Sequence, residues 1–537
     1  MEFNADIAIV ICFLLVTLFI GMYCGRGIKT IKEYALGNRT FNTTTLAATI
    51  LATWTAGSDF TITITGIYTK GIWYFLARFG DALNLLVIGL ILAPRLKNFF
   101  GSLSVAETMG IYYGKYARII TAVASICIAS GAVACQITIF SMIFSYFLDI
   151  NNNYILIASS IVLVVYSSFG GIKAVTFTDV FQFLTFGISI PVFALFIWQI
   201  FGDIELAKNA MEHPLFNPSQ TLKINSPKML PSLNLFLCFV LPALNPTMFQ
   251  RILMAKDEKQ IKYSFVLASL ISLIIFFMAS FISFIAFSHN PNIEQDNLIM
   301  YIIDTYSFPE LKVVLMLGII AMVMSTADSW LNAGSVIFAH DICNPLGIKL
   351  KNELTVSKNC TIFMGIFAIL LATASDDLLA LILLIDNFYM PVVTVPLAFA
   401  IFGFRTTARP FLISVFIAIF FVIIWRAYIQ PITDIDSLIP GMLANLIAFL
   451  STHYLLQEPG GWVKNTKEGN NKDGTKKQFR EFLKNLPDNI SKFNLLEFCR
   501  KGLPYSSKTY IYFSIATFLT LITTISIDKV LYQDNFY

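Results

Sequence analysis

Long apolar runs separated by short polar segments make up most of the chain. The first run, from Ala5 to Gly25, is as long as a helix needs to be to cross a bilayer. It lacks a basic leading region and a small-residue cleavage site, so we interpret it as a membrane span rather than a signal peptide. The pattern predicts fourteen spans, at 5–25, 44–66, 72–94, 118–147, 154–170, 176–201, 229–249, 261–288, 311–339, 358–374, 377–402, 410–427, 437–456 and 510–530.

Two of these spans are interrupted by residues that do not suit a membrane helix. The second contains TWTAGSDFTITITG, which has two glycines, several hydroxyls and a carboxylate. A charge near the bilayer centre costs about 2.5–3.5 kcal/mol. The seventh contains Pro242 and Pro246 in CFVLPALNPTMFQR, and proline frees an upstream carbonyl. Glycines and prolines that only kink these helices are the alternative interpretation.

The two interrupted spans occupy equivalent places in the chain. Spans two to six and spans seven to eleven form two blocks of five, and each block begins with an interrupted span. Because five is odd, the blocks enter the membrane from opposite sides, as in an inverted-topology repeat. The pattern therefore predicts an all-α integral membrane protein with about fourteen transmembrane helices, a 5+5 inverted-repeat core and a binding site near the midplane.

Composition and charge support this map. The chain has 537 residues, of which 56% are hydrophobic and 13% charged, and its mean hydropathy is +0.71. The loops on one predicted side hold 29 of the 37 Lys and Arg residues. By the positive-inside rule these loops are cytoplasmic, so we expect both termini outside. The eight cysteines show neither metal-type nor disulfide-type spacing, and we interpret them as small apolar residues.

The same map divides the chain into six parts. A phosphate-binding loop and a histidine cluster are missing from the sequence, so we expect neither an enzyme nor a nucleic-acid-binding protein. The parts are 1–43 (first span and inside loop), 44–201 (first five-helix repeat), 202–402 (outside loop and second five-helix repeat), 403–456 (two accessory spans), 457–509 (basic cytoplasmic loop) and 510–537 (last span and outside C-terminus).

The ninth span carries a polar face. Ser325, Asp328, Ser329 and Asn332 lie at i, i+3, i+4 and i+7, which places them on one side of a helix. Such a stripe faces the bundle interior or a water-filled cavity. Hydrogen bonding between helices could explain it, but that role does not require the Asp328 carboxylate. Hydroxyl and main-chain oxygens are the ligands that hard cations prefer.

Five segments resemble the sodium/solute symporter family, and most closely its bacterial sodium/proline symporter-like members. They occur in family order as KEYALGNR (32–39), AGSDF (56–60), YSSFGGIKAVTFTDVFQF (166–183), NPTMFQR (245–251) and AMVMST (321–326). The resemblance implies a leucine-transporter-type core and a coupling sodium ion as the only cofactor. The residues that it assigns to sodium are Gly57, Phe60 and Met322 through main-chain oxygens, and Ser325 and Thr326 through hydroxyls.

The resemblance also assigns two ion-coupling carboxylates and a substrate pocket. Asp59 matches the critical aspartate beside the sodium site, although a structural pair with Arg78 is the alternative, and Asp179 matches the carboxylate near the inner route of ion release. Proline symporters line their pocket with aromatic residues, whereas the matching positions here are not aromatic, which argues against proline. The predicted substrate residues are Ser58, Thr63, Cys127, Cys238, Pro242, Asn245 and Asp328.

The role of Asp328 stays open, because it could face a substrate amine, hold a second cation or neutralise Arg78. We predict a sodium-coupled symporter that imports a small, for example amino-acid-like, solute by alternating access. The alternative is a transporter-like solute sensor that acts with a separate signalling partner. The expected location is the bacterial cytoplasmic (inner) membrane, with multiple spans, and a homo-oligomer is not required for transport.

Overall fold

The computed structural model describes residues 5–148, 171–221, 228–294, 298–348, 352–374 and 377–462, together with the single positions 156, 160, 161, 164, 226 and 350. Most of the predicted span 154–170, the first residues of the YSSFGG motif, the basic loop 457–509 beyond residue 462 and the last span 510–530 therefore lie outside the described residues.

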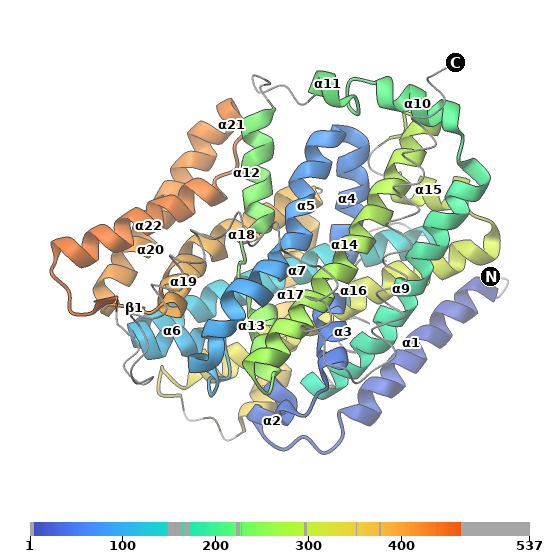
Figure 1. The fold of residues 1–537 in the computed structure, drawn as a ribbon. Helices are drawn as coiled ribbons and strands as arrows, with labels where there is room; N and C mark the ends of the chain where they lie inside the picture. The colour runs from blue at the N-terminus through green and yellow to red at the C-terminus, as the bar shows by residue number, and fades with distance from the viewer. Residues whose placement is uncertain are drawn as a thin grey trace, which may run out of the picture. The chain divides into compact units, whose positions relative to one another are not determined.

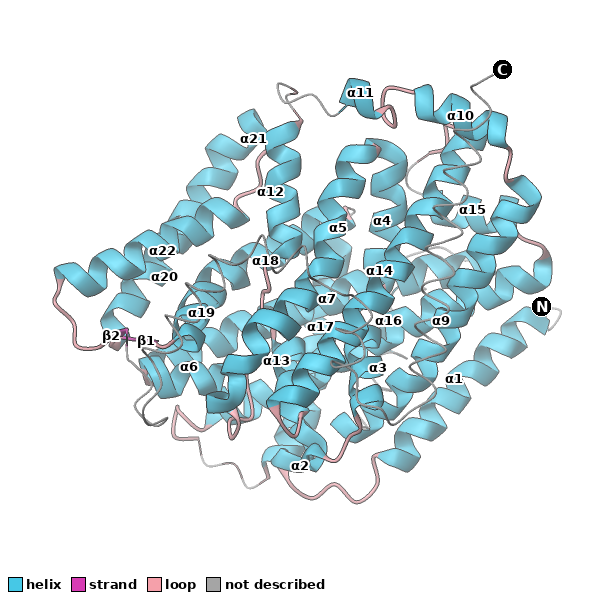
Figure 2. Cartoon of the chain, viewed as in Figure 1, coloured by secondary structure: helices cyan, strands magenta, loops and turns pink. Residues whose placement is uncertain are grey.

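Helices make up nearly all of the described chain (Figure 2). They are α1 (Ala5–Cys24), α2 (Ile31–Leu36), α3 (Thr43–Trp54), α4 (Gly57–Lys70), α5 (Ile72–Val87), α6 (Val105–Tyr113), α7 (Lys115–Leu148), α9 (Ile172–Phe201), α10 (Ile204–Glu212), α11 (Pro218–Thr221), α12 (Met229–Val240), α13 (Pro246–Met254), α14 (Glu258–His289), α15 (Leu298–Tyr306), α16 (Pro309–Ile337), α17 (Glu353–Ala374), α18 (Leu378–Tyr389), α19 (Val395–Phe402), α20 (Ala408–Ile424), α21 (Gln430–Thr433) and α22 (Leu438–Leu455).

Short irregular helical turns and one small sheet complete the described elements. The strands β1 (Phe404–Arg405) and β2 (Gly461–Trp462) pair antiparallel, with Phe404 opposite Trp462. The π-helical turns are Ile88–Leu92, Phe338–Cys343, Met390–Thr394 and Trp425–Ile429, and the 3-10 turns are Gly37–Arg39 and Ala93–Phe99.

Nine helical segments within the described residues are long and apolar enough to cross a membrane. The number of spans is lower than the predicted fourteen for three reasons. Each half of the two interrupted spans is too short to qualify alone, the first span counts only over Ala8–Cys24 as a shorter apolar helix, and two predicted spans lie wholly or mostly outside the described residues. The total of fourteen therefore stays a prediction.

The first predicted interruption lies between α3 and α4. Thr55 and Ala56 leave the helical conformation (φ −83°, ψ 79° and φ −76°, ψ 148°) and Gly57 begins the next helix. A Cβ on Gly57 would lie 2.5 Å from the Val323 side chain, so glycine lets α4 approach α16 closely. Gly66, in contrast, does not interrupt the helix, because α4 continues to Lys70.

The second interruption lies between α12 and α13. α12 ends at Val240, and the residues up to Asn245 are not helical. Leu244 adopts a positive φ of 49°. The Asn245 side chain accepts a hydrogen bond from the Met248 amide, and Pro246 takes the first helical position, where its missing N–H costs nothing. Both predicted interruptions are confirmed.

The interrupted helices pack inside the bundle. α16 packs against α7 and α9, while α14 packs against α3 and α5 packs against α12. In Figure 1, α2 lies at the bottom of the bundle, and α10 and α11 lie at the top. Residues 26–43 and the segment after residue 202, which were assigned to opposite sides of the membrane, therefore lie at opposite ends of the described bundle.

Candidate functional site

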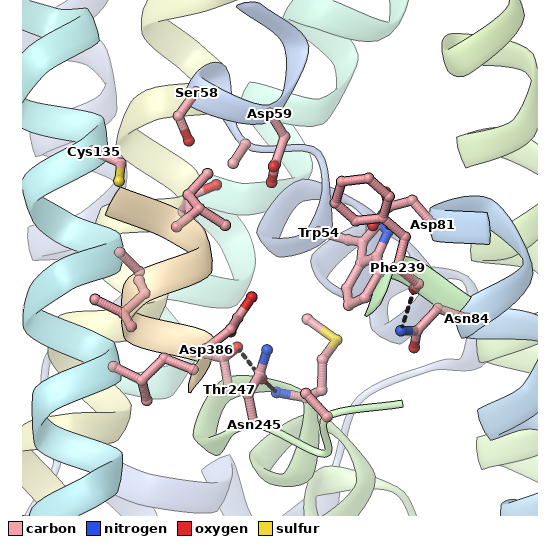
Figure 3. Close-up of a pocket in the computed structure, with 18 of the residues that line it drawn as sticks. Trp54, Ser58, Asp59, Asp81, Asn84, Cys135, Phe239, Asn245, Thr247 and Asp386 are labelled. Atoms are coloured by element: carbon pink, nitrogen blue, oxygen red, sulfur yellow. Dashed lines mark hydrogen bonds between the residues drawn. The ribbon is translucent and has the colours of Figure 1, made fainter. Parts of the chain in front are cut away.

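A cavity of about 130 Å³ lies where the two interruptions meet. Its walls come from both interrupted helices and from α5, α7, α16 and α18, including Ala56 and Ser58 at the first interruption and Leu241 and Ala243 at the second. A single water needs only ~10–15 Å³ of such volume, so the cavity has room for several waters or a small solute. Figure 3 shows side chains from these separate elements converging on it.

A buried arginine organises one side of the cavity. Arg78 Nη2 lies 2.8 Å from Asp59 Oδ1, and its Nη1 lies 4.0 Å from Asp81 Oδ1. Its Nε donates to the Thr63 hydroxyl at 3.1 Å, and its guanidinium lies 4.5 Å from the centroid of the Phe239 ring. The alternative pair of Asp59 with Arg78 is therefore present in the structure, and Asp59 still lines the cavity.

Hydrogen bonds fix further polar groups around the first interruption. The Gln136 amide nitrogen donates to the Ser58 hydroxyl at 2.7 Å, and its oxygen accepts from the Ser58 backbone N–H at 3.4 Å. The Trp54 indole N–H donates to the Asp81 carboxylate at 3.1 Å. These contacts link α4 to α7 and α3 to α5, and they orient polar atoms at the cavity wall.

The polar face of α16 meets the end of α3. The Ser325 hydroxyl lies 2.8 Å from the Ala52 carbonyl oxygen and 3.0 Å from that of Met322. The Thr326 hydroxyl lies 3.5 Å from the Thr53 carbonyl oxygen. Three of the five predicted sodium ligands, Met322, Ser325 and Thr326, therefore lie together beside free carbonyls of an interrupted helix.

Gly57 and Phe60 lie in the first turn of α4, after the end of α3. Gly57 packs against Val323 on α16, and its carbonyl accepts the Thr61 hydroxyl. The last carbonyls of a helix lack partners in that helix, and the two that the Ser325 and Thr326 hydroxyls contact are those of Ala52 and Thr53 at the end of α3. The assignment of the Gly57 and Phe60 carbonyls to sodium stays a prediction.

A fully buried network lies between the cavity and α2. Arg251 Nη2 donates to Ser329 at 2.6 Å, to Thr53 at 2.9 Å and to Asp179 at 3.2 Å. Asp179 also accepts the Thr49 hydroxyl. Asp179, predicted near the inner route, therefore joins α9 to α3 and α13, and Arg251 extends the link to α16.

A second layer of the network reaches α2. Gln250, the neighbour of Arg251 on α13, donates from its amide nitrogen to the Asn332 side chain at 3.0 Å and to the Ala35 carbonyl at 2.9 Å. Ala35 lies in α2, and Gln250 and Asn332 are buried. We call these two layers the inner seal; its residues are Thr49, Thr53, Asp179, Gln250, Arg251, Ser329 and Asn332.

The predicted substrate residues occupy three kinds of position. Ser58, Cys238 and Asn245 line the cavity, while Thr63 lies beside it at Arg78 and Pro242 lies within the second interruption. Asp328 is buried on α16, does not line the cavity and is engaged in an interaction. The salt bridges of Arg78 in the described chain are with Asp59 and Asp81, and the role of Asp328 stays a prediction.

The prediction that Cys127 lines the substrate pocket is wrong, because its side chain is exposed on the outer surface of α7. The face of α7 that lines the cavity carries Ile128, Ala132, Cys135 and Gln136, which recur at helical spacing. Cys127 precedes this face by one residue and is rotated away from the cavity.

Four functional candidates were missed by the sequence reasoning. Asp81 lies three residues after Arg78 on α5, and Asp386 is an isolated carboxylate in the apolar run LILLIDNFYM. A carboxylate at membrane depth is itself a signal of function, and this signal could have identified both. Nothing in the local sequence indicated Gln136. Arg251 ends the NPTMFQR motif, but its role could not be predicted because its partners lie on distant helices.

Comparison with known proteins adds three findings. The model of the sodium:solute symporter family matches residues 34–417. Over 199 residues the chain is 25% identical to high-affinity choline transporter 1 of Drosophila melanogaster, an alignment that covers 36% of this chain and 32% of that protein. The chain thus spans about a third of the length of this curated relative.

The solved structures show the fold. The chain resembles a Na+-coupled sialic acid symporter in a substrate-bound outward-open state, with a TM-score of 0.73, 20% identity and coverage of 86% of this chain and 99% of that one. It also resembles a nucleobase-cation-symport-1 family transporter in a closed conformation, with a TM-score of 0.50, 11% identity and coverage of 80% and 96%. The predicted leucine-transporter-type fold is confirmed.

Proposed function

The chain belongs to the sodium:solute symporter family, and from this premise we propose that it is a carrier that uses a sodium gradient to import a small organic solute. The observation that carries the proposal is the meeting of the Ser325 and Thr326 hydroxyls with the free carbonyls at the end of α3. Neutral oxygens from two helices suit a hard monovalent cation.

The proposed sodium site uses the main-chain oxygens of Ala52, Thr53 and Met322 and the hydroxyls of Ser325 and Thr326. The family resemblance names Gly57 and Phe60 in place of the first two; Ala52 and Thr53 are favoured because their carbonyls, at the end of α3, face the hydroxyls of α16. The Ser325 hydroxyl donates to the Ala52 and Met322 carbonyls. With sodium present, the hydroxyl oxygens and the carbonyl oxygens would all turn toward the ion.

In this mechanism sodium binding holds α3 against α16 and so completes one wall of the solute cavity. Solute then binds between the two interruptions, and opening toward the cytoplasm requires the inner seal to separate. Asp59 stabilises the positive side of the cavity through Arg78, and Asp179 links the seal to the same α3 segment. Both carboxylates are thus placed to couple ion occupancy to movement.

The driving force is sufficient for accumulation. One charge that crosses ~100 mV contributes about 2.3 kcal/mol, and a roughly tenfold sodium gradient adds about 1.4 kcal/mol. Together, about 3.7 kcal/mol supports solute accumulation of several hundredfold for one sodium per solute.

We place the protein in the bacterial inner membrane with both termini outside, on the strength of the positive-inside pattern and a composition rich in Ile, Lys, Asn and Phe. The substrates of the relatives do not decide the solute, since choline is a cation and sialic acid is an anion. The solute class has to be argued from the cavity itself.

The proposal is tested by equilibrium binding of radioactive sodium to the purified full chain. We expect saturable binding by the wild type and at least a tenfold weaker affinity, about 1.4 kcal/mol, in Ser325→Ala/Thr326→Ala. The matched control is Ser335→Ala, a buried serine further along α16 whose hydroxyl donates to the Asn332 carbonyl within the same helix. Equal affinity in the double variant and the wild type would contradict the site.

A further inference from the structure

The cavity carries an excess of negative charge. Its lining includes three carboxylates, Asp59, Asp81 and Asp386, and one guanidinium, Arg78. Three negative charges against one positive charge leave two uncompensated when all four groups are ionised. A transported anion would therefore meet net repulsion in this cavity, whereas a cation would be attracted.

Two of the three carboxylates already have partners. Asp59 forms the ion pair with Arg78 at 2.8 Å. Asp81 lies 4.0 Å from the same guanidinium and accepts the Trp54 indole N–H at 3.1 Å. The positive charge of Arg78 is thus committed to the α4–α5 side of the cavity.

Asp386 differs from the other two. It lies on α18 across the cavity from Arg78, and Figure 3 shows its carboxylate pointing into the space between the two interruptions. Among the described residues it makes no salt bridge and no hydrogen bond through its side chain. The charges close enough to act on it are the carboxylates of Asp59, Asp81 and Asp436 and the single guanidinium of Arg78.

An unpaired carboxylate in such a place requires a positive partner. The effective penalty for burying an ion without one is several kcal/mol, and ionisable groups inside membrane proteins mark substrate or ion pathways. The lining of the cavity that Asp386 faces indicates what kind of partner fits. Trp54, Phe239 and Trp330 contribute aromatic side chains, and Ile385 and Met390 contribute apolar ones.

These walls favour an organic cation over a metal ion. A hard metal cation prefers a shell of several oxygen ligands, and it gains nothing from the aromatic and aliphatic part of the cavity lining. An alkylammonium group instead gains from aromatic faces through cation–π attraction. Arg78 already shows this preference, since its guanidinium lies over the Phe239 ring at 4.5 Å.

We infer that the solute carried through this cavity has a cationic nitrogen group, an amine or a quaternary ammonium, and that Asp386 is its counter-ion. This inference rests on the proposed transport function and specifies the solute class for the same cavity. The lower rim, where the Asn245 and Thr247 side chains bond to each other, supplies polar atoms for the rest of the solute.

The test compares small probes that differ in charge. The purified full chain is unfolded thermally at a fixed sodium concentration with propylammonium, propan-1-ol or propionate, and with tetramethylammonium or tert-butanol. We expect the two cations to raise the unfolding temperature in a saturable way and their uncharged or anionic counterparts not to. This comparison uses the wild type alone, so it does not depend on whether a variant folds.

The second arm of the test assigns the effect to Asp386. In Asp386→Asn the half-saturating concentration of each cation should rise at least tenfold, and Asp386→Glu should recover part of the loss. The control is Asp434→Asn, an exposed aspartate at a positive φ of 54° between α21 and α22, where asparagine is well tolerated. It should behave as the wild type does.

Two results would overturn the inference: equal stabilisation by propan-1-ol or propionate, or an unchanged midpoint in a folded Asp386→Asn. Sodium binding measured on the same samples separates this inference from the transport proposal. A wild type that binds sodium but does not respond to the cations leaves the transport function intact and removes the cation site. A wild type that responds to the cations but binds no sodium keeps the cation site and removes the sodium-coupled transport proposal.

Discussion

Arg78 shows how the protein keeps a charge at membrane depth. Its side chain is only 5% exposed, and it is satisfied by a carboxylate, a hydroxyl and an aromatic face. Burial of an ion without such partners is costly. Because one guanidinium holds both Asp59 and Asp81, it also fixes the positions of two cavity carboxylates relative to each other.

The pair can be tested with a double-mutant cycle on Asp59→Asn and Arg78→Met. Each single variant should lower the free energy of unfolding by about 1–3 kcal/mol, below the ~3–5 kcal/mol of a fully buried pair, because the Asp59 side chain is 30% exposed. The double variant should lose less than the sum of the two. The measurement is thermal or denaturant unfolding; additive losses would contradict a direct pair.

The same variants separate two roles of Asp59. If Asp59 serves only to neutralise Arg78, the double variant should bind radioactive sodium as the wild type does. If Asp59 acts on the ion, as the family resemblance implies, sodium affinity stays reduced when Arg78 is also replaced. We expect the second outcome, since Asp59 lines the cavity one turn beyond the α3 carbonyls.

At the scale of the elements, the helix that follows each interruption begins with a residue suited to that position. α4 begins with Gly57, which permits close approach to Val323. α13 begins with Pro246, preceded by the Asn245 cap. The unpaired carbonyls that an ion requires and the cavity that a solute requires thus arise from the same two local events.

Asn245 provides a test of capping against solute contact. Asn245→Ala removes the hydrogen bond to the Met248 amide and should lower stability by about 0.5–2 kcal/mol. Asn245→Ser keeps a capping oxygen but shortens the side chain. We expect stability to recover in the serine variant and solute uptake to stay reduced in both, measured in proteoliposomes. Full uptake by the serine variant would show that Asn245 only caps α13 and does not contact the solute.

Gly66 provides a test of close packing between α4 and α5. A Cβ at this position would lie 2.3 Å from the Tyr74 ring, which is almost fully buried and cannot move cheaply. We expect Gly66→Ala to lower stability by about 1–3 kcal/mol, as followed by thermal unfolding.

The control for this substitution is Gly187→Ala in α9. A Cβ at position 187 would lie 3.3 Å from the ring edge of Phe183, which is on the same helix. Replacing a helical glycine with alanine stabilises a helix by roughly 0.5–1 kcal/mol when space allows. A similar loss in both variants would show that α4 and α5 are not closely packed at Gly66.

At the scale of the whole described unit, the inner seal connects the proposed sodium site to the α2 end of the bundle. Thr53 belongs to both, since its carbonyl receives the Thr326 hydroxyl and its own hydroxyl receives Arg251. Movement of α3 therefore changes the sodium site and the seal together. This shared residue is a physical basis for coupling between ion occupancy and opening.

The seal can be tested by alkylation of Cys135 and Cys238, which line the cavity. In vesicles that expose the α2 end to a membrane-impermeant maleimide, both cysteines should react slowly in the wild type. Asp179→Asn removes a charge-assisted hydrogen bond worth about 1.5–3 kcal/mol, so labelling should rise about tenfold or more. Sodium should lower it again.

Peptide mass spectrometry would quantify the labelling at each cysteine. The control is Asp257→Asn, because Asp257 is exposed, caps α14 through its side chain, and can be replaced by another good capping residue. Unchanged labelling in Asp179→Asn, in a protein that folds, would show that Arg251 and Asp179 do not close the inner end.

The sequence by itself determined the features that depend on local pattern. Runs of apolar residues predicted the spans, and Gly57, Pro242 and Pro246 predicted which helices are interrupted. Helical spacing placed Ser325, Ser329 and Asn332 on one face, and all three now lie on the buried polar side of α16. These properties need only neighbouring residues, so they can be read before folding is considered.

Only the tertiary structure decided which distant groups meet. The end of α3 at Trp54 decides which carbonyls face Ser325, and no motif states where a helix stops. Arg78 pairs with Asp59 because α4 and α5 lie side by side, whereas Asp81 lies on the same helix as Arg78. Asp386 became a site residue only because the fold brings α18 to the cavity that α4 and α5 also line. Contacts between different helices join residues far apart in the chain, 273 positions apart for Ser325 and Ala52, and local periodicity carries no information about them.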